Sequence, residues 1–166
     1  MKKVMKVMLV ALMVLVPCNG CIEKKSDEQY VSKQLDLTLP AVENIESSDT
    51  HGGFHGDGYY VVKMEFDKQS GEDLLKCIEN MEKWKALPLE EPLELLMYGG
   101  SKGGSSYAYK FATQAGIPKI EEGYYLFLDR QQENQGTSLL YRASFNFSLA
   151  MYDSRGHVLY YYEIDT

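Results

Sequence analysis

The stretch DTHGGFHGDGYY, residues 49–60, holds the densest group of side chains in the chain that could do chemistry. Two aspartates and two histidines lie within it, at Asp49, His51, His55 and Asp57. Imidazole nitrogens and carboxylate oxygens are ligands for Zn²⁺, and three of them with a water molecule would form a centre that activates hydroxide. One hypothesis is therefore a metal-dependent hydrolase that uses this turn.

The glycines of the same stretch favour a different interpretation. Four of them lie among the candidate ligands, and glycine disfavours the helix that would bring His51 and His55 onto one face. The spacing also matches no metal motif with a physical rationale. We therefore favour a glycine-rich turn with solvated histidines that leads into a strand at Tyr59, and we expect no metal and no other cofactor.

The segments after the turn predict the elements that would hold it. Residues 59–66, YYVVKMEF, place alternate apolar side chains on one face, as a strand does. In SGED, Ser70 is the expected N-cap of a helix, and EEPLELLMYGG, residues 90–100, predicts a second, short helix. The glycine- and serine-rich residues 99–106 predict a flexible loop.

Three β-rich runs, GYYLFLDR, RASFNFSLAMY and HVLYYYEI, dominate the C-terminal third. DSRG forms a turn between the last two runs, so we expect an antiparallel meander. The sequence therefore predicts one α+β domain over residues 35–166. Its antiparallel sheet would have about four strands, including this C-terminal three-strand meander, and one or two helices would cover one face of the sheet.

Tyrosine occurs thirteen times in the chain. Adjacent strand residues face opposite ways, so consecutive tyrosines must place rings on both sides of the sheet. An exposed row of such rings could stack on sugars or grip a peptide. The other interpretation is that tyrosine is simply favoured in strands. The candidate binding residues are Tyr124, Tyr125, Tyr160, Tyr161 and Tyr162.

The first residues have the layout of a secretory signal peptide. Three lysines precede an apolar stretch, residues 7–16, that is about half as long as a membrane-spanning helix needs to be. The following LVPCNGC resembles the lipobox of bacterial lipoproteins, in which a cysteine becomes the lipid-bearing first residue. Gly20 is the small residue that such a site accommodates. The resemblance therefore implies that residues 1–20 are removed and that Cys21 carries the lipid, with Cys18 as the alternative.

The segment after the lipobox and the overall charge narrow the possible partners. Residues 21–34 are highly charged and poor in large apolar groups, so we expect a flexible tether that carries the lipid anchor. Loss of residues 1–20 would remove three lysines, which leaves 14 basic and 24 acidic residues and a net charge of −10. Such a surface repels phosphate backbones, so we expect no nucleic acid as a partner.

These features predict a location more directly than a reaction. Beyond the lipobox, the chain resembles small lipoproteins of Gram-positive bacteria, which implies lipid anchoring at the extracytoplasmic face of the cell membrane. Secretion without lipid is the alternative. The expected partners are the membrane, through the anchor, and a protein or glycan of the cell envelope. The favoured function is a non-catalytic binding module, and the alternative is the metal-dependent hydrolase.

Overall fold

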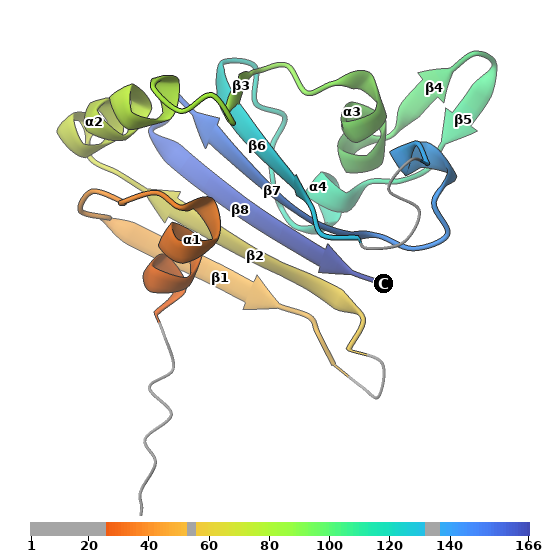
Figure 1. Ribbon diagram of the computed structural model, residues 1–166, viewed down its shortest axis with the longest axis horizontal. Coiled ribbons are helices and arrows are strands. Elements are labelled where there is room, and N and C mark those ends of the chain that lie inside the picture. The colour runs from red at the N-terminus through yellow and green to blue at the C-terminus, as the bar shows by residue number, and fades with distance from the viewer. Residues whose placement is uncertain (1–25, 53–55, 132–136) are drawn as a thin grey trace, which may run out of the picture.

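The computed structural model describes residues 26–52, 56–131 and 137–166 (Figure 1). The strands are β1 (Asn44–Asp49), β2 (Gly58–Glu65), β3 (Lys85–Ala86), β4 (Gly100–Lys102), β5 (Ser105–Tyr107), β6 (Gly123–Asp129), β7 (Asn146–Asp153) and β8 (Val158–Asp165). The helices are α1 (Asp27–Leu35), α2 (Lys68–Glu79), α3 (Glu91–Tyr98) and α4 (Phe111–Gln114), with one 3₁₀ turn, η1 (Leu139–Tyr141). No helix within the described ranges is long and apolar enough to span a bilayer.

Six of the strands form one antiparallel sheet in the order β1-β2-β8-β7-β6-β3. The last three strands, β6, β7 and β8, pair consecutively, so the predicted meander is confirmed. The α+β class is confirmed as well. The number of strands exceeds the predicted four because β1 and the two-residue β3 extend the sheet at its two edges, and β4 and β5 add a separate hairpin.

Helices cover both faces of the sheet, which corrects the prediction of a single covered face. Helices α1 and α2 pack on one face, and α3 and α4 pack on the other (Figure 1). The 3₁₀ turn η1 packs with α3 and α4 through Leu140. The central strands explain this arrangement, because they are apolar on both sides. Met151 and Tyr152, neighbours on β7, are 1% and 0% exposed and belong to the two different clusters. A sheet with two apolar faces must be covered twice to leave water.

The double cover also buries the tyrosines that were considered as an exposed binding row. Consecutive rings do face opposite sides, since Tyr161 lies in the cluster under α1 and α2 whereas Tyr160 and Tyr162 lie in the other cluster. These three and Tyr125 are buried, and Tyr124 is half-buried. Of the two interpretations, the exposed row is therefore the one that the structure contradicts, because helices cover both faces of these strands.

Helix α1 covers the second half of the segment 21–34 that was predicted to be a flexible tether and ends one residue beyond it, at Leu35. Val31 and Leu35, one helical turn apart, are both 0% exposed and pack on the sheet. The Ser26 hydroxyl caps the helix start by accepting a backbone amide hydrogen. These apolar side chains dock the helix once the sheet supplies a surface for them. The tether prediction is therefore wrong from Asp27 onward.

Helix α2 begins at Lys68, before the predicted start, and its N-cap is Asp67 in place of Ser70. The Asp67 carboxylate accepts the Ser70 amide hydrogen at 2.9 Å and the Ser70 hydroxyl hydrogen at 2.8 Å. These two hydrogen bonds lower the pKa of Asp67, the amide more than the hydroxyl. The prediction of Ser70 as N-cap is therefore wrong, since Ser70 lies in the first turn as a partner of the Asp67 cap.

The segment 90–107 contains one confirmed and one corrected prediction. Helix α3 forms as expected, with its proline in the first turn and Gly99 as its C-cap. The residues predicted to be a flexible loop instead form the hairpin of β4 and β5. Gly103 and Gly104 at its tip have φ values of 56° and 83°. Positive φ at both central residues is the requirement of a tight hairpin turn, which is why glycine is needed there.

Replacing Asp67 tests the observed start of α2. Asp67→Ala should lower the free energy of unfolding because the Ser70 amide loses its acceptor, whereas Asp67→Asn should retain most of it because asparagine also caps helices. The wild type should have a higher free energy of unfolding than the Asn variant, and this difference should be complete above pH 3.8, the ordinary pKa of aspartate. The difference should be lost as the pH falls through the lower pKa of Asp67 in the folded state. Urea unfolding at neutral and acid pH measures both effects. Equal stability of all three proteins would contradict the cap.

Candidate functional site

The stretch 49–60 connects the antiparallel strands β1 and β2. Asp49, the last residue of β1, pairs with Tyr60 of β2. The next two residues, Thr50 and Tyr59, are joined by two hydrogen bonds at the base of the connection. The Thr50 amide donates to the Tyr59 carbonyl at 2.9 Å, and the Tyr59 amide donates to Thr50 Oγ1 at 2.8 Å. In the part of this stretch that the structure describes, the favoured interpretation of a turn that starts a strand is therefore confirmed.

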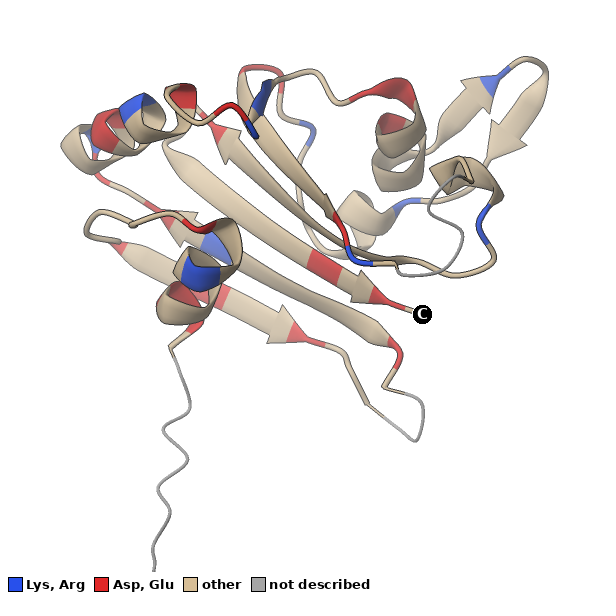
Figure 2. Cartoon of the chain, viewed as in Figure 1, with Lys and Arg blue, Asp and Glu red and all other residues tan. Residues whose placement is uncertain are grey.

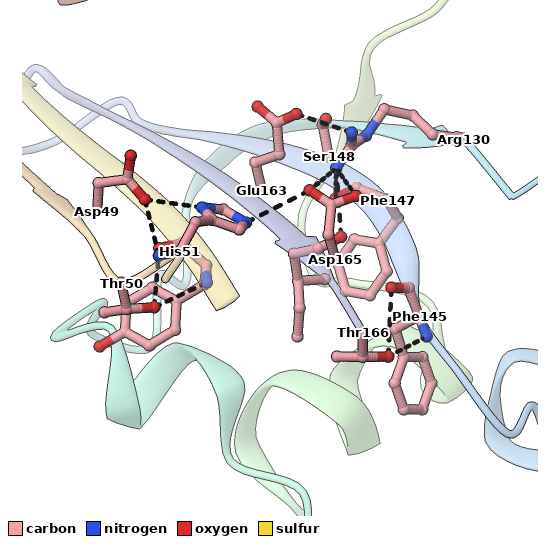
Figure 3. A network of polar contacts seen from close by, with 12 residues as sticks. Asp49, Thr50, His51, Arg130, Phe145, Phe147, Ser148, Glu163, Asp165 and Thr166 are labelled. Atoms are coloured by element: carbon pink, nitrogen blue, oxygen red, sulfur yellow. Dashed lines mark hydrogen bonds and ion pairs between the residues drawn. The ribbon is translucent and has the colours of Figure 1, made fainter. Parts of the chain in front are cut away.

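His51 is held between two carboxylates (Figure 3). Its Nδ1 atom lies 2.7 Å from Asp49 Oδ1, which also accepts the His51 amide hydrogen at 3.0 Å. Its Nε2 atom is buried and lies 3.4 Å from Asp165 Oδ2, which is an ion-pair distance but too long for a well-formed hydrogen bond. The expectation of solvated histidines is wrong for His51, whose side chain is only 25% exposed. The sheet order explains this, because it places the end of β8 beside the start of β2.

The other candidate ligands do not join this group. Asp57 is exposed, and His55 lies outside the described residues. Within the ranges that the structure describes, no three His, Cys, Asp or Glu side chains are arranged to hold a metal ion. The fold thus brings Asp49 and His51 together with Asp165, which lies more than a hundred positions further along the sequence.

An open pocket of about 460 Å³ lies beside these residues, between α1 and the strands β1, β2 and β8. We call it the α1 pocket, and its volume is in the range of small-molecule binding sites. The two acidic residues of β8, Glu163 and Asp165, lie toward the end of the strand at this side, where Figure 2 shows its ribbon in red. The residues that line the α1 pocket are Asp27, Tyr30, Ser47, Asp49, His51, Tyr60 and Glu163.

Glu163 is the most deeply buried charged group of the α1 pocket, with a side chain that is 10% exposed. Its Oε1 atom lies 2.8 Å from Arg130 Nη1. Its Oε2 atom accepts the hydroxyl hydrogens of Tyr30 and Tyr161, each at 2.9 Å. Arg130 also lies 3.2 Å from Asp165 through its Nη2 atom. A buried carboxylate needs partners of this kind because its removal from water is costly.

Asp27, at the start of α1, carries the second carboxylate of the α1 pocket. Its Oδ1 atom accepts the Tyr60 hydroxyl hydrogen at 2.8 Å, and its Oδ2 atom accepts the Ser47 hydroxyl hydrogen at 2.6 Å. These bonds join the helix to β2 and β1. Both partners are neutral, and no Lys or Arg of the described ranges forms an ion pair with Asp27. Asp27 is therefore a carboxylate without a compensating positive charge among those residues.

Three tyrosines pack against one another beside these carboxylates. The rings of Tyr30, Tyr60 and Tyr161 form edge-to-face pairs with centroid separations of 5.7, 6.2 and 6.4 Å. Burial, and next the hydrogen bond to Glu163, raises the pKa of Tyr30 to about 12. Burial, and next the hydrogen bond to Asp27, raises the pKa of Tyr60. Burial also raises the pKa of Tyr161. All three hydroxyls therefore keep their protons at neutral pH.

The sequence patterns identified Asp49 and His51 and missed the rest of the α1 pocket. One signal was available, because Glu163 interrupts the otherwise apolar run of YYYEI, and a charge placed in a buried strand needs a partner. Asp27 and Tyr30 gave no signal, since their segment was predicted to be a tether. Chemically, the assembled residues present fixed carboxylate and hydroxyl oxygens to a molecule that enters the pocket.

Replacing Gly58 tests how the turn packs on the first residue of β2. A Cβ atom at Gly58 would lie 2.7 Å from the Cα atom of His51, so the backbone of the turn would have to move. Gly58→Ala should therefore destabilise the protein by about 1 to 3 kcal/mol. Gly52→Ala is the matched control, because its nearest contact would be at 3.8 Å, and it should stay within about 0.5 kcal/mol of wild type. Urea midpoints that are equal for the two variants would contradict the packing of His51 over Gly58.

Comparisons with known proteins assign no function to the chain, so a function has to be argued from the geometry of the α1 pocket. No family model matches the chain, and neither a curated protein nor a solved structure is significantly similar to it. The α1 pocket, with its buried Glu163 and with Asp27, which pairs with no Lys or Arg of the described residues, is therefore the feature from which a function can be argued.

Proposed function

We propose that the protein is a lipid-anchored, non-catalytic binding module at the extracytoplasmic face of the cell membrane. Its ligand is a protein or glycan component of the cell envelope, bound in the α1 pocket. The observation that carries the proposal is Glu163, whose carboxylate is nine-tenths buried and still lines an open pocket of about 460 Å³. The anchor is the lipid on Cys21, with Cys18 as the alternative, and both cysteines lie outside the described residues.

The placement of Glu163 supports a role in binding. Well-packed apolar side chains often stabilise a fold as well as a buried ion pair does, or better. Tyr161, two positions earlier and therefore on the same face of β8 as Glu163, is itself buried, so this face of the strand accommodates large apolar groups. A carboxylate at this position, held by Arg130 and open to a pocket, is better explained by contact with a ligand than by stability.

The polar groups of the α1 pocket are also fixed before a ligand arrives. Asp27 is held from β1 and β2, and Glu163 is held by Arg130 and by a hydroxyl from α1. His51 is held by Asp49. Groups that are already oriented lose little conformational entropy on binding, which favours recognition of a ligand with a matching arrangement of polar atoms.

The contacts of Ser47 favour binding over nucleophilic catalysis. A serine nucleophile is activated by a base within hydrogen-bond distance, most often a histidine. The Ser47 hydroxyl donates to Asp27 at 2.6 Å, whereas His51 pairs with Asp49. The hydrogen bond between Ser47 and Asp27 therefore joins β1 to α1 beside the α1 pocket. Ser47 is not aligned with His51 as a nucleophile with its base.

The anchor predicts a change in location when its cysteine is removed. Cys21→Ser in the full-length chain should abolish labelling by a traceable fatty acid, and it should release the protein to the medium or leave an uncleaved precursor. Cys18→Ser should remain labelled and membrane-bound, and the reverse pattern would assign the lipid to Cys18. Membrane fractionation with label detection measures both. A wild-type chain that stays in the membrane fraction without any lipid label would contradict the anchor.

The binding role predicts position-dependent cross-linking in the native host. A photoreactive residue placed at Ser47 in the anchored chain should capture an envelope component, because this position lines the α1 pocket. The matched control is the same residue at Ser101, an exposed position on β4 outside the pocket. A product specific to Ser47 is the expected result on gels and by mass spectrometry. Identical products at the two positions, or none at either, would contradict binding in the α1 pocket.

A further inference from the structure

We infer that the α1 pocket binds an organic cation through an alkylammonium group. This inference rests on the proposed binding role of the α1 pocket and adds the chemistry of the ligand. The ammonium could belong to a free amine or to a lysine side chain of an envelope protein, and the recognition chemistry is the same in both cases. Three independent features of the lining residues lead to it.

The first feature is the hydrogen-bonding capacity that the pocket leaves available. Tyr30 donates its hydroxyl hydrogen to Glu163, and Tyr60 and Ser47 donate theirs to Asp27. A hydroxyl has a single donor hydrogen but also carries acceptor lone pairs. A carboxylate offers about four acceptor positions, and these hydroxyls occupy two of those on Asp27. Asp27 is an acceptor only, and the hydroxyls of Tyr60 and Ser47 have used their donor hydrogens but can still accept, which selects a ligand that brings donor hydrogens.

The second feature is the charge of the lining. It includes three carboxylates, Asp27, Asp49 and Glu163, and its basic member is His51. Arg130 compensates Glu163 at 2.8 Å, whereas the hydrogen-bond partners of Asp27 are neutral hydroxyls. The same field acts on Tyr60, because the charges of Asp27 and Asp49 add to burial and to the hydrogen bond that Tyr60 donates to Asp27 in raising the pKa of Tyr60. A positive ligand therefore gains from entering, and an anion is repelled.

The third feature is the aromatic part of the lining. Tyr30 and Tyr60 both line the α1 pocket and contact each other at a centroid separation of 5.7 Å. Tyrosine rings attract cations and also cover the apolar stem that carries an ammonium group. A volume of about 460 Å³ admits such a stem together with its charged end. An alkylammonium ion, with three donor hydrogens and one positive charge, thus matches the acceptors, the charge and the rings together.

The test is a ligand-observed saturation-transfer NMR titration of the full-length chain in detergent. The probes are Nα-acetyl-lysine methylamide, its Nε-acetylated form, which lacks the charge, and Nα-acetyl-glutamate methylamide, which reverses it. Saturable binding of the lysine probe alone is expected, and it should weaken as sodium chloride is added because salt screens charges. Asp27→Asn should weaken this binding by about tenfold. Asp73→Asn, the same change on α2 outside the α1 pocket, should leave it unchanged.

Each result of this titration decides the assignment. Equal binding of the charged and acetylated lysine probes, or of the glutamate probe, would overturn the inference, and so would an unchanged affinity in a folded Asp27→Asn chain. Should that variant not fold, the salt dependence and the probe series on the wild type still decide. Putrescine that binds as tightly as the lysine probe would indicate a free amine, and binding that needs the peptide-like probe would indicate a protein side chain. If Ser47 cross-links a component while no amine binds, the binding role stands and the cation assignment fails.

Discussion

The burial of β8 on both of its faces is the constraint on which the rest of the structure depends. Every residue from Leu159 to Ile164 is buried, and the strand pairs with β2 on one side and β7 on the other. Antiparallel sheets commonly leave one face to solvent, whereas strands buried on both faces are more typical of parallel sheets. Here an antiparallel sheet is buried on both faces, by α1 and α2 on one face and by α3 and α4 on the other.

Glu163 is the exception within this buried strand, and the α1 pocket is organised around it. Arg130, Tyr30 and Tyr161 supply its partners from the segment after β6, from α1 and from β8 itself. The same helix delivers Asp27 to the strands β1 and β2. Helix α1 therefore has two roles that cannot be separated: its apolar side chains complete one layer of the core, and its polar side chains complete the walls of the pocket.

The strands and short turns could be predicted because their signals are local. Alternation in YYVVKMEF and the three C-terminal runs locate β2, β6, β7 and β8, and Pro92 with Gly99 locates α3. Helix α1 could not be predicted from its composition, because Val31 and Leu35 stabilise it only against a sheet that forms from distant segments. Propensity is a weak guide where tertiary packing supplies most of the helical stability.

The candidate site was predictable only in its local part. Asp49 and His51 are close in sequence and stay close in the fold. In the described structure they form a hydrogen-bonded pair with each other, whereas the sequence suggests them as candidate metal ligands. Asp165, which lies beyond His51, and Glu163, which lines the same pocket, come from the last strand. Their proximity depends on β2 pairing with β8, which no periodicity in a single segment reveals.

The two edges of the sheet differ, and the difference bears on how the molecules behave when crowded together. The edge at β3 has only two residues and offers little template for another strand. The edge at β1 has six exposed residues, and its outer backbone groups have no partner strand among the described residues. The charges of Glu46 and Asp49 on this strand repel a second copy of the same sequence. Charge along this strand therefore opposes edge-to-edge pairing between neighbouring molecules, and high salt weakens this protection.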